Sequence, residues 1–427
     1  MPSLRKLHDQ TGLSITTVYQ AYIELEKRGV VVPRQKSGYF VKPLLDRILP
    51  PPEVQKLRPV PKKVTMNTLA YSIVEEMSNP DFLQLGGSVV MPELLPFKQL
   101  TRCLRAESMD AMKRSLMRYE NPYGNDELKR QIAKRMHGQA RQAITDEMVI
   151  TSGCIEAVSL CLQAVGNAGD TVVVESPTYP WFLQIIEDQN KFALEIPTHP
   201  QTGIDLDQLN RAVQKNAVAA CLLVPNFHNP LGFAMPEEQK KALVKMMGEM
   251  NISIIEDNIH GELYFGDARP TTLKSMDRKG LVLHCASFSK TLSPGLRVGW
   301  ALPGRFSDRV KRLKMNSTIA SPTLNQQVVA QFLKTGAFDR HLRRLRSALR
   351  NQITNTALAI ARTFPNGTRI TAPQGGLTLW VELDKKVDGL KVFQEARMKK
   401  ISIFPGIICS TTGRYRNFIR ISCGYPW

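Results

Sequence analysis

From Met148 onward, short apolar runs alternate with helical patterns, and this alternation constrains the fold more than any other feature of the chain. The apolar runs cover Met148–Thr151, Thr171–Glu175, Val218–Val224, Ile252–Glu256, Leu281–Ser287 and Arg297–Ala301. The helical patterns between them include Ile155–Ala164, Leu206–Gln214 and Pro236–Met250. The alternation predicts an α/β fold with a mainly parallel sheet that helices cover on both faces. Because such sheets bind ligands at the carboxyl ends of their strands, the residues after each run are the candidate site.

Three polar motifs follow these runs. Ser152-Gly153-Cys154 opens a helix, and the free N–H groups and dipole of a helix N-terminus can hold a phosphate. Asn229 precedes a proline in a tight loop, from which its amide can face a ligand. Asp257 follows a strand and places a carboxylate at the mouth of the sheet. Each motif also has a structural interpretation, as a helix start, a turn or an N-cap, so the motifs taken singly leave both roles open.

The most specific segment runs from Ser287 to Trp300. It reads Ser-Phe-Ser-Lys-Thr-Leu-Ser-Pro-Gly-Leu-Arg-Val-Gly-Trp and places Lys290 directly after an apolar strand, with Arg297 seven residues later. A buried lysine is costly unless it is neutralised or covalently engaged. The segment indicates a reactive lysine, and a structural lysine is the alternative when the segment is taken alone.

The order and spacing of these motifs resemble the fold-type I aminotransferases, which carry pyridoxal 5′-phosphate, over residues 64–427. That cofactor requires a Schiff-base lysine, a carboxylate for its ring nitrogen and a cup for its phosphate. The resemblance implies the fold of these transferases, with a mainly parallel sheet of the seven-stranded type, helices on both faces and a smaller α+β domain.

The resemblance also implies roles for individual residues. Lys290 would be the catalytic, Schiff-base lysine, and Asp257 would hold the proton on the ring nitrogen. The other implied cofactor contacts are Asn229 at the phenolic oxygen, Tyr179 on the ring face, Ser152, Gly153, Cys154, Ser287 and Arg297 around the phosphate, and Tyr119 at the phosphate of a neighbouring subunit. Arg420 would clamp a substrate carboxylate bidentately. Without the resemblance, Tyr119 and Tyr179 are ordinary half-buried aromatics and Arg420 is a surface ion-pair partner.

One candidate residue departs from the family pattern. Three residues past Asp257 the family usually has a tyrosine that supports the phenolic oxygen, and this chain has His260. A histidine can donate a hydrogen bond there, but its reach is shorter and it titrates near neutral pH. We therefore expect His260 to contact the cofactor and to change the protonation of the site.

The N-terminal region carries a second pattern, rich in positive charge. The chain has 57 Lys and Arg against 38 Asp and Glu, and residues 1–63 alone have 12 against 5. The expected elements are helices over Leu4–Gln10 and Ile15–Arg28, capped by Ser14 and Gly29, and strands over Val30–Val32 and Tyr39–Val41. This order predicts a winged helix-turn-helix, whose second helix enters the major groove of DNA. A small helical subdomain without DNA binding is the alternative.

The N-terminal segments resemble the DNA-binding head of GntR-type bacterial regulators. The resemblance rests on Ser3-Leu4-Arg5-Lys6-Leu7, Thr11-Gly12-Leu13-Ser14, Thr16-Thr17-Val18 and Gly38-Tyr39-Phe40-Val41. It implies DNA contacts by Arg5, Ser14, Thr16, Thr17 and Gly38. GntR heads usually begin with a further helix, so we expect a partial head over residues 1–42. We likewise expect the large domain, residues 64–427, to lack the closing helix of its family.

Between the two patterns lies a proline-rich segment, residues 43–63. Six prolines fall between Lys42 and Lys62, which disfavours both helix and central strand. We expect an extended, semi-rigid linker between the two modules.

The remaining composition excludes several classes of protein. No apolar run approaches the length of a membrane span, and the N-terminus does not have the pattern of a signal peptide. The seven cysteines are scattered without a paired motif, which indicates reduced thiols in a cytoplasm and no metal site.

A GntR-type head joined to an aminotransferase-like domain is the architecture of MocR-type regulators. The leading hypothesis is a homodimeric, pyridoxal-phosphate-binding regulator that senses an amino acid or another amine and places two heads on operator half-sites. The alternative is a working aminotransferase that acts on an amino acid and a 2-oxo acid. A third interpretation is a gene remnant that folds poorly.

Overall fold

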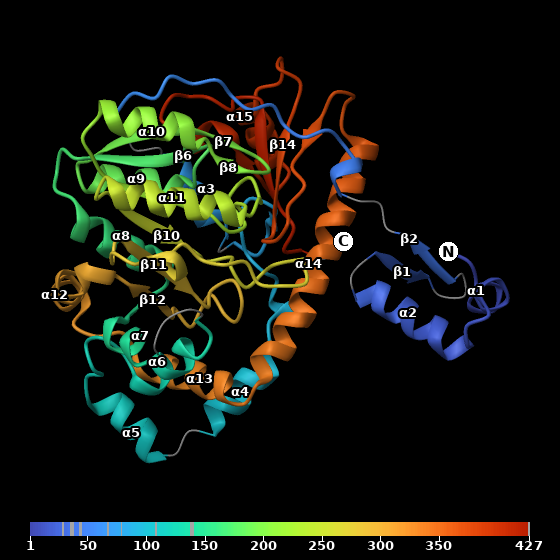
Figure 1. Ribbon diagram of the computed structural model, residues 1–427, viewed down its shortest axis with the longest axis horizontal. Helices are drawn as coiled ribbons and strands as arrows, with labels where there is room; N and C mark the ends of the chain where they lie inside the picture. The colour runs from blue at the N-terminus through green and yellow to red at the C-terminus, as the bar shows by residue number, and fades with distance from the viewer. Residues whose placement is uncertain are drawn as a thin grey trace.

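A small N-terminal head and a large α/β body make up the chain, and the head lies to one side of the body (Figure 1). The structure is a computed structural model and describes residues 1–27, 30–34, 38–41, 45–65, 68–77, 79–106, 109–136 and 141–425. No helix in these ranges is both long and apolar enough to cross a bilayer. All seven cysteines are buried and free, as the sequence predicts.

The body is built on a nine-stranded sheet. Its strands are β3 (Lys62–Lys63), β5 (Val149–Thr151), β6 (Thr171–Ser176), β7 (Phe192–His199), β8 (Gly203–Ile204), β9 (Val218–Leu223), β10 (Ser253–Asp257), β11 (Val282–Ser287) and β12 (Gly299–Leu302). They follow the order β3-β7-β6-β9-β10-β11-β12-β5, with β8 paired to β7. The central strands β7, β6, β9, β10 and β11 are parallel, and β12 and β5 are antiparallel to their neighbours. The predicted parallel core is confirmed.

Helices cover both faces of this sheet. Alternate residues of a strand point to opposite faces, and the apolar residues on each face pack against helices. On β6, Val172 and Val174 pack in one apolar cluster with residues of α8 (Cys154–Val165) and α9 (Pro180–Asp188). Val173 packs in another cluster with residues of α10 (Leu206–Lys215) and α11 (Glu237–Glu249). Burial on both faces explains why these strands appear in the sequence as continuous apolar runs.

The smaller domain contains a four-stranded antiparallel sheet. Its strands are β13 (Arg369–Ile370), β14 (Thr378–Glu382), β16 (Phe404–Pro405) and β17 (Phe418–Ser422), in the order β13-β14-β17-β16. The long helix α14 (Ala337–Thr363) leads into this domain from the body (Figure 1). A two-stranded pair of β4 (Leu83–Gln84) and β15 (Ile401–Ser402) brings the segment before residue 90 alongside the same domain.

The remaining helices surround these sheets. They are α3 (Thr68–Met77), α4 (Phe97–Arg105), α5 (Met109–Met117), α6 (Asp126–Ala133), α7 (Arg141–Glu147), α12 (Ser307–Thr318), α13 (Thr323–Lys334) and α15 (Gly389–Met398). Short 3-10 turns occur at η1 (Leu45–Arg47), η2 (Pro92–Leu94), η3 (Lys274–Met276), η4 (Gly304–Phe306) and η5 (Gly406–Cys409).

The head has the predicted order of two helices and two strands, namely α1 (Leu4–Thr11), α2 (Ile15–Lys27), β1 (Val31–Arg34) and β2 (Gly38–Val41). Ser14 Oγ accepts a hydrogen bond from Thr17 N at 3.1 Å, which is the predicted N-cap. Val18, Tyr22 and Val31 form the buried core of the head. The first strand runs to Arg34 rather than ending at Val32, because Arg34 pairs with Gly38. The predicted cap at Gly29 lies outside the described residues.

In the part of the proline-rich segment that the structure describes, the short turn η1 precedes an extended stretch, and the segment lies against the body from Leu45 onward. Leu45, Ile48 and Leu49 pack on the core of the body. Pro50 O accepts a hydrogen bond from Ile370 N at 3.0 Å, and Lys62–Lys63 join the edge of the large sheet as β3. Residues 45–63 are therefore held along the body by hydrogen bonds and apolar contacts instead of spanning a gap.

Candidate functional site

The carboxyl ends of the parallel strands surround a cavity of about 200 Å³, the place that the sequence predicts for a ligand. Its walls come from α8, α9, the end of β10 and the segments that follow β9, β10 and β11. Of the predicted residues, those that line it are Cys154, Tyr179, Asn229, Asp257, His260, Lys290 and Arg297, and Ser88 and Ser289 line it as well.

Lys290 enters this cavity from the turn after β11. Its Nζ donates a hydrogen bond to Ser88 O. Burial, together with the positive charges of Arg420 and Arg297, lowers the pKa of Lys290 to about 8. A substantial fraction of this amine is therefore unprotonated slightly above neutral pH, and an unprotonated amine is a nucleophile.

Asp257 lies at the end of β10 and is almost completely buried. Its Oδ1 accepts hydrogen bonds from Ile259 N at 2.9 Å and from the Cys154 thiol at 3.3 Å. Burial raises the pKa of Asp257 to about 6. The carboxylate is thus held in place inside the protein, where a positively charged group of a ligand would stabilise its ionised form.

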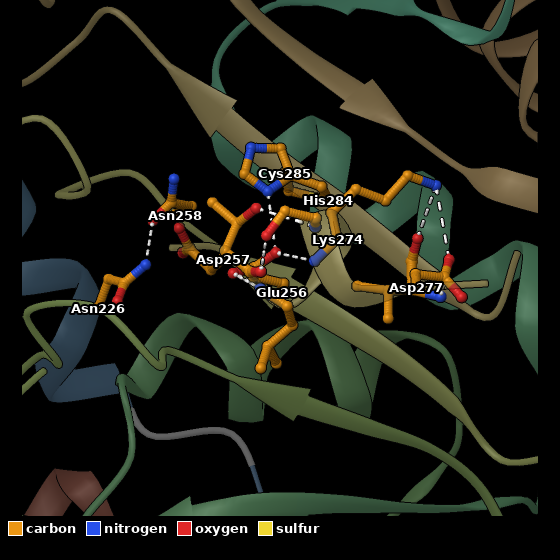
Figure 2. A network of polar contacts seen from close by, with 12 residues as sticks. Asn226, Glu256, Asp257, Asn258, Lys274, Asp277, His284 and Cys285 are labelled. Atoms are coloured by element: carbon orange, nitrogen blue, oxygen red, sulfur yellow. Dashed lines mark hydrogen bonds and ion pairs between the residues drawn. The ribbon is translucent and has the colours of Figure 1, made fainter. Parts of the chain in front are cut away.

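The neighbouring carboxylate, Glu256, points to the other side of β10 and anchors the strand (Figure 2). His284 Nδ1 lies 3.0 Å from Glu256 Oε2. The backbone N–H of Leu273 donates to Oε1 at 2.9 Å and that of Lys274 to Oε2 at 3.1 Å. Although burial opposes ionisation, these contacts lower the pKa of Glu256. This support for Glu256 could not be predicted from the sequence, since nothing in the local pattern indicates that His284 faces Glu256.

Arg420 reaches the cavity region from β17 of the smaller domain and is 2% exposed. Its guanidinium donates to Asn229 Oδ1 at 2.8 Å and to Gly86 O at 2.6 Å, and it lies 3.8 Å from the centre of the Phe404 ring. Within the described ranges Arg420 has no carboxylate partner, and its Nε has no hydrogen-bond partner. The burial excludes a surface ion pair, and the uncompensated charge fits an incoming carboxylate.

The residues predicted to hold a phosphate lie around the start of α8. Gly153 has a φ of 97°, and a Cβ there would lie 2.5 Å from the Arg297 guanidinium, so a side chain would collide with it. Arg297 donates to Ser152 O at 2.6 Å and to Ser289 Oγ at 3.4 Å. These contacts place the guanidinium beside the helix N-terminus, a combination that suits a phosphate.

The side chains of two residues predicted for the cup make other hydrogen bonds. The Cys154 thiol donates to Asp257, as described above, and Ser287 Oγ accepts a hydrogen bond from Ser289 N at 3.3 Å. Of the two serines, Ser289 lines the cavity. Ser287 is the last residue of β11, whereas Ser289 lies in the turn after the strand, and the sequence pattern did not locate this boundary.

The aromatic side of the cavity contains Tyr179, the residue before α9. Its ring meets that of Phe182 edge to face, with 5.5 Å between the ring centres. Burial raises the pKa of Tyr179 to about 12, so its hydroxyl stays protonated at any physiological pH.

His260 is buried in the same wall but does not have the expected chemistry. Its Nδ1 lies 3.1 Å from Phe227 O. A carbonyl oxygen only accepts hydrogen bonds, so Nδ1 carries the proton and Nε2 is an acceptor. Burial, followed by the charge of Lys290, lowers the pKa of His260 to about 3. Nε2 has no partner among the described residues. His260 is therefore a neutral acceptor rather than the hydrogen-bond donor that the sequence suggested.

The other predicted residues lie outside the cavity. Tyr119 is 83% exposed and does not line it. Arg5, Ser14, Thr16, Thr17 and Gly38 are all exposed on the head. In the described part of the chain, no group of three or more His, Cys, Asp or Glu side chains is arranged to hold a metal ion.

The residues of the cavity fit pyridoxal 5′-phosphate. Lys290 offers an amine of lowered pKa, Asp257 a buried carboxylate, and Gly153 with Arg297 a cradle that a Cβ would fill. The uncompensated guanidinium of Arg420 adds a place for a carboxylate beside the cavity. This set of groups fits a phosphorylated aldehyde cofactor and an amine ligand.

The comparisons with known proteins give the family. A family model for aminotransferase class I and II matches residues 94–426, and the chain belongs to that family. The solved structure of LysN, an α-aminoadipate aminotransferase from Thermus thermophilus complexed with N-(5′-phosphopyridoxyl)-L-leucine, is 28% identical. It has a TM-score of 0.77, with 85% of this chain and 90% of that chain covered.

Relatives that match along the whole chain, including the head, show which kind of protein within this family the chain resembles. Two uncharacterized HTH-type transcriptional regulators of Escherichia coli, YjiR and YdcR, are each 36% identical over 100% of this chain, covering 90% and 91% of their own lengths. The regulator NorG of Staphylococcus aureus is 26% identical over 100% of this chain and 95% of its own length. The chain is thus a member of the HTH-type regulators that carry an aminotransferase domain.

Proposed function

We propose that this chain is a MocR-type regulator of the GntR family, which binds pyridoxal 5′-phosphate in its body and DNA through its head. One observation carries the proposal: a single chain joins an exposed helix-turn-helix and wing to a cavity that fits a phosphorylated cofactor. The full-length similarity to HTH-type regulators supports it. The buried free cysteines agree with a reducing, cytoplasmic setting.

The cofactor supplies an electrophilic carbon and a protonated ring that withdraws electrons. The chain supplies the groups that hold it and move protons. Lys290 Nζ would be the attachment point of the cofactor and would move a proton of the amine ligand. Asp257 would hold the proton on the ring nitrogen, and Tyr179 would lie against the ring. Arg420 orients the ligand through its carboxylate.

The phosphate of the cofactor would lie in the cup that the start of α8 forms with Arg297. The backbone of Ser152 and Gly153 approaches it without obstruction, because Gly153 has no Cβ. In a homodimer, Tyr119 of one subunit would reach the phosphate in the other. That arrangement accounts for the exposure of Tyr119 and of the nearby Met109, Leu116 and Met117, because a partner subunit would cover them.

The head would read DNA with the first turn of α2. Ser14, Thr16 and Thr17 present exposed hydroxyls there, which suit contacts to phosphates and base edges, and Arg5 and Gly38 flank them on α1 and the wing. A dimer would present two heads to two operator half-sites. Binding of an amine ligand whose carboxylate pairs with Arg420 would then change the conformation of the body and, through it, the relative position of the two heads.

The test needs no known operator. Cofactor-loaded protein is used to select DNA from a fragment library, and the affinity for the selected fragment is measured by fluorescence anisotropy. Thr16→Ala/Thr17→Ala should weaken binding at least tenfold, whereas Thr318→Ala/Thr363→Ala, which alters threonines of the body, should not. Selection of no fragment, or equal binding by both variants, would exclude DNA recognition by this head. Loss of visible absorbance in Lys290→Ala tests the cofactor separately.

Aminotransferase activity is the second candidate, because the amine of Lys290, the carboxylate of Asp257 and the unpaired Arg420 are the groups that transamination requires. A panel of amino acids is mixed with cofactor-loaded protein, and formation of the 2-oxo acid product is followed. Repeated turnover with an added 2-oxo acid would favour the enzyme. A spectral response without turnover would favour the sensor.

A further inference from the structure

A second, larger cavity lies between the proline-rich segment and the body. Its volume is about 730 Å³, within the range of small-molecule sites. One wall is formed by residues 56–62 of the segment and the other by the loop 411–414. It is separate from the cofactor cavity, with which it shares no lining residue.

Four cations from two parts of the chain meet around this cavity. Lys56, Arg58 and Lys62 come from the proline-rich segment, and Arg414 comes from the opposite loop. Arg414 donates to Lys56 O at 2.7 Å, which fastens the segment to the loop. Among the residues that the structure describes, none of the four forms an ion pair with a carboxylate. Docking of the segment therefore places four cations and one carboxylate around a single cavity.

The single carboxylate in the lining, Glu195, is already occupied. Its oxygens accept hydrogen bonds from Ser176 Oγ at 2.6 Å, from Ser410 Oγ at 2.8 Å, and from Thr411 N and Oγ1, each at 2.7 Å. These neutral donors hold Glu195, and within the described residues it forms no ion pair with the four cations, so the lining has more positive than negative charges. A ligand that neutralises the cations has to bring its own negative charge.

We propose that this linker cavity, lined by residues 56–62 and 411–414, binds a small anion that carries phosphate groups. Phosphate oxygens match the ammonium and guanidinium donors, and the hydroxyls of Thr411 and Thr412 border the same space. A small molecule fits a concave space between two segments, whereas the backbone of a DNA duplex is a convex surface that would need a more open groove.

The position of the cavity suggests how its ligand could regulate the protein. An anion that contacts both the proline-rich segment and the loop 411–414 would hold the segment on the body, and this segment leads to the head. The cavity wall also connects to the cofactor site, because Ser176, which donates to Glu195, lies three residues before Tyr179. Thr178 N donates a hydrogen bond to Cys409 O at 2.9 Å. This bond links the residue next to Tyr179 with the chain that leads to Arg414.

The test uses the full chain saturated with pyridoxal 5′-phosphate, so that the phosphate cup of the cofactor site is filled, and inorganic pyrophosphate as the probe. Isothermal titration at low ionic strength should give one site per chain. Arg58→Gln/Lys62→Gln should weaken the affinity at least tenfold. The control, Lys391→Gln/Lys399→Gln, removes two exposed charges of the body away from the cavity and should bind as the wild type does.

A second measurement reports on the segment itself. Trypsin cleavage after Lys56, followed by mass spectrometry, should slow when pyrophosphate is present in the wild type and in the control but not in Arg58→Gln/Lys62→Gln. Absence of pyrophosphate binding, or equal affinity in the wild type and that variant, would overturn the proposal. So would a result in which Arg58→Gln/Lys62→Gln weakens DNA binding while pyrophosphate does not bind, because the cations would then serve nucleic acid.

Discussion

The guanidinium of Arg420 donates a hydrogen bond to Asn229 Oδ1 at 2.8 Å, which joins the smaller domain directly to the loop after β9. The residue proposed to bind the ligand carboxylate therefore contacts a residue proposed to bind the cofactor. This contact spans 191 residues of sequence. A ligand that pairs with Arg420 would alter its hydrogen bond to Asn229, a residue proposed to contact the cofactor. Ligand binding could in this way change the contacts between the smaller domain and the rest of the body.

Arg420→Lys should reduce the response to amino acids. A lysine supplies one point charge in place of the two parallel donors of a guanidinium, and a charge-assisted hydrogen bond contributes about 1.5–3 kcal/mol. The amino-acid concentration for a half-maximal change in cofactor absorbance should therefore rise at least tenfold. Arg416→Lys, on an exposed residue of the same segment, is the control and should leave it unchanged. An equal response in both variants would exclude Arg420 as the carboxylate site.

Gly153→Ala should weaken cofactor binding and lower stability. The new Cβ would lie 2.5 Å from the Arg297 guanidinium, and the backbone has a φ of 97° that a side chain rarely adopts. Gly169→Ala separates the two effects, since Gly169 has a φ of 88° but nothing within 4 Å of its Cβ position.

Both variants should lose about 1–2 kcal/mol of unfolding free energy from the backbone, measured by denaturant titration of the cofactor-free protein. Gly153→Ala alone should also lose affinity for the cofactor, about tenfold or more, measured by quenching of protein fluorescence. If both variants kept full affinity, the proposed phosphate cup would be wrong.

Asp257 should make cofactor affinity depend on pH. Burial raises its pKa to about 6, so the cofactor-free carboxyl is ionised above pH 6 and protonated below it. Only the ionised form pairs with a protonated ring nitrogen, so affinity should fall by up to tenfold per pH unit as the pH drops from about 6 towards 5. Asp257→Asn should bind more weakly at pH 7 and lack this additional fall. Parallel pH profiles of the two proteins would contradict the assignment.

The alternation of apolar runs and helical patterns predicted the parallel core of the sheet and placed Lys290, Asp257 and Gly153 at its edge, because these positions follow from strand ends and short turns. The partners of these residues did not follow from the sequence. Whether Cys154 faces the phosphate or Asp257 depends on the rotation of α8 against β10, which no local pattern encodes. The docking of Lys62 on the sheet edge depends on a strand more than a hundred residues later.

His260 shows most clearly where prediction from sequence ends. Its position three residues past Asp257 identified it as a cofactor contact, and it lines the cavity. Its protonated nitrogen is set by Phe227 O, a backbone atom 33 residues away, in a residue with a positive φ of 57°. Residue type gives the ability to donate or accept a hydrogen bond, and only the tertiary contact decides which nitrogen does so.

His260→Tyr should therefore change the protonation of the bound cofactor. His260 Nε2 accepts hydrogen bonds and does not stabilise a negative phenolic oxygen, whereas a tyrosine hydroxyl can donate to it. The pH midpoint of the spectral titration of the bound cofactor should fall by about one unit in His260→Tyr relative to the wild type. His260→Phe, which neither donates nor accepts at this place, should leave the midpoint near that of the wild type. A rise in His260→Phe would show that His260 donates its hydrogen bond to the cofactor after all, and an unchanged midpoint in His260→Tyr would contradict the prediction.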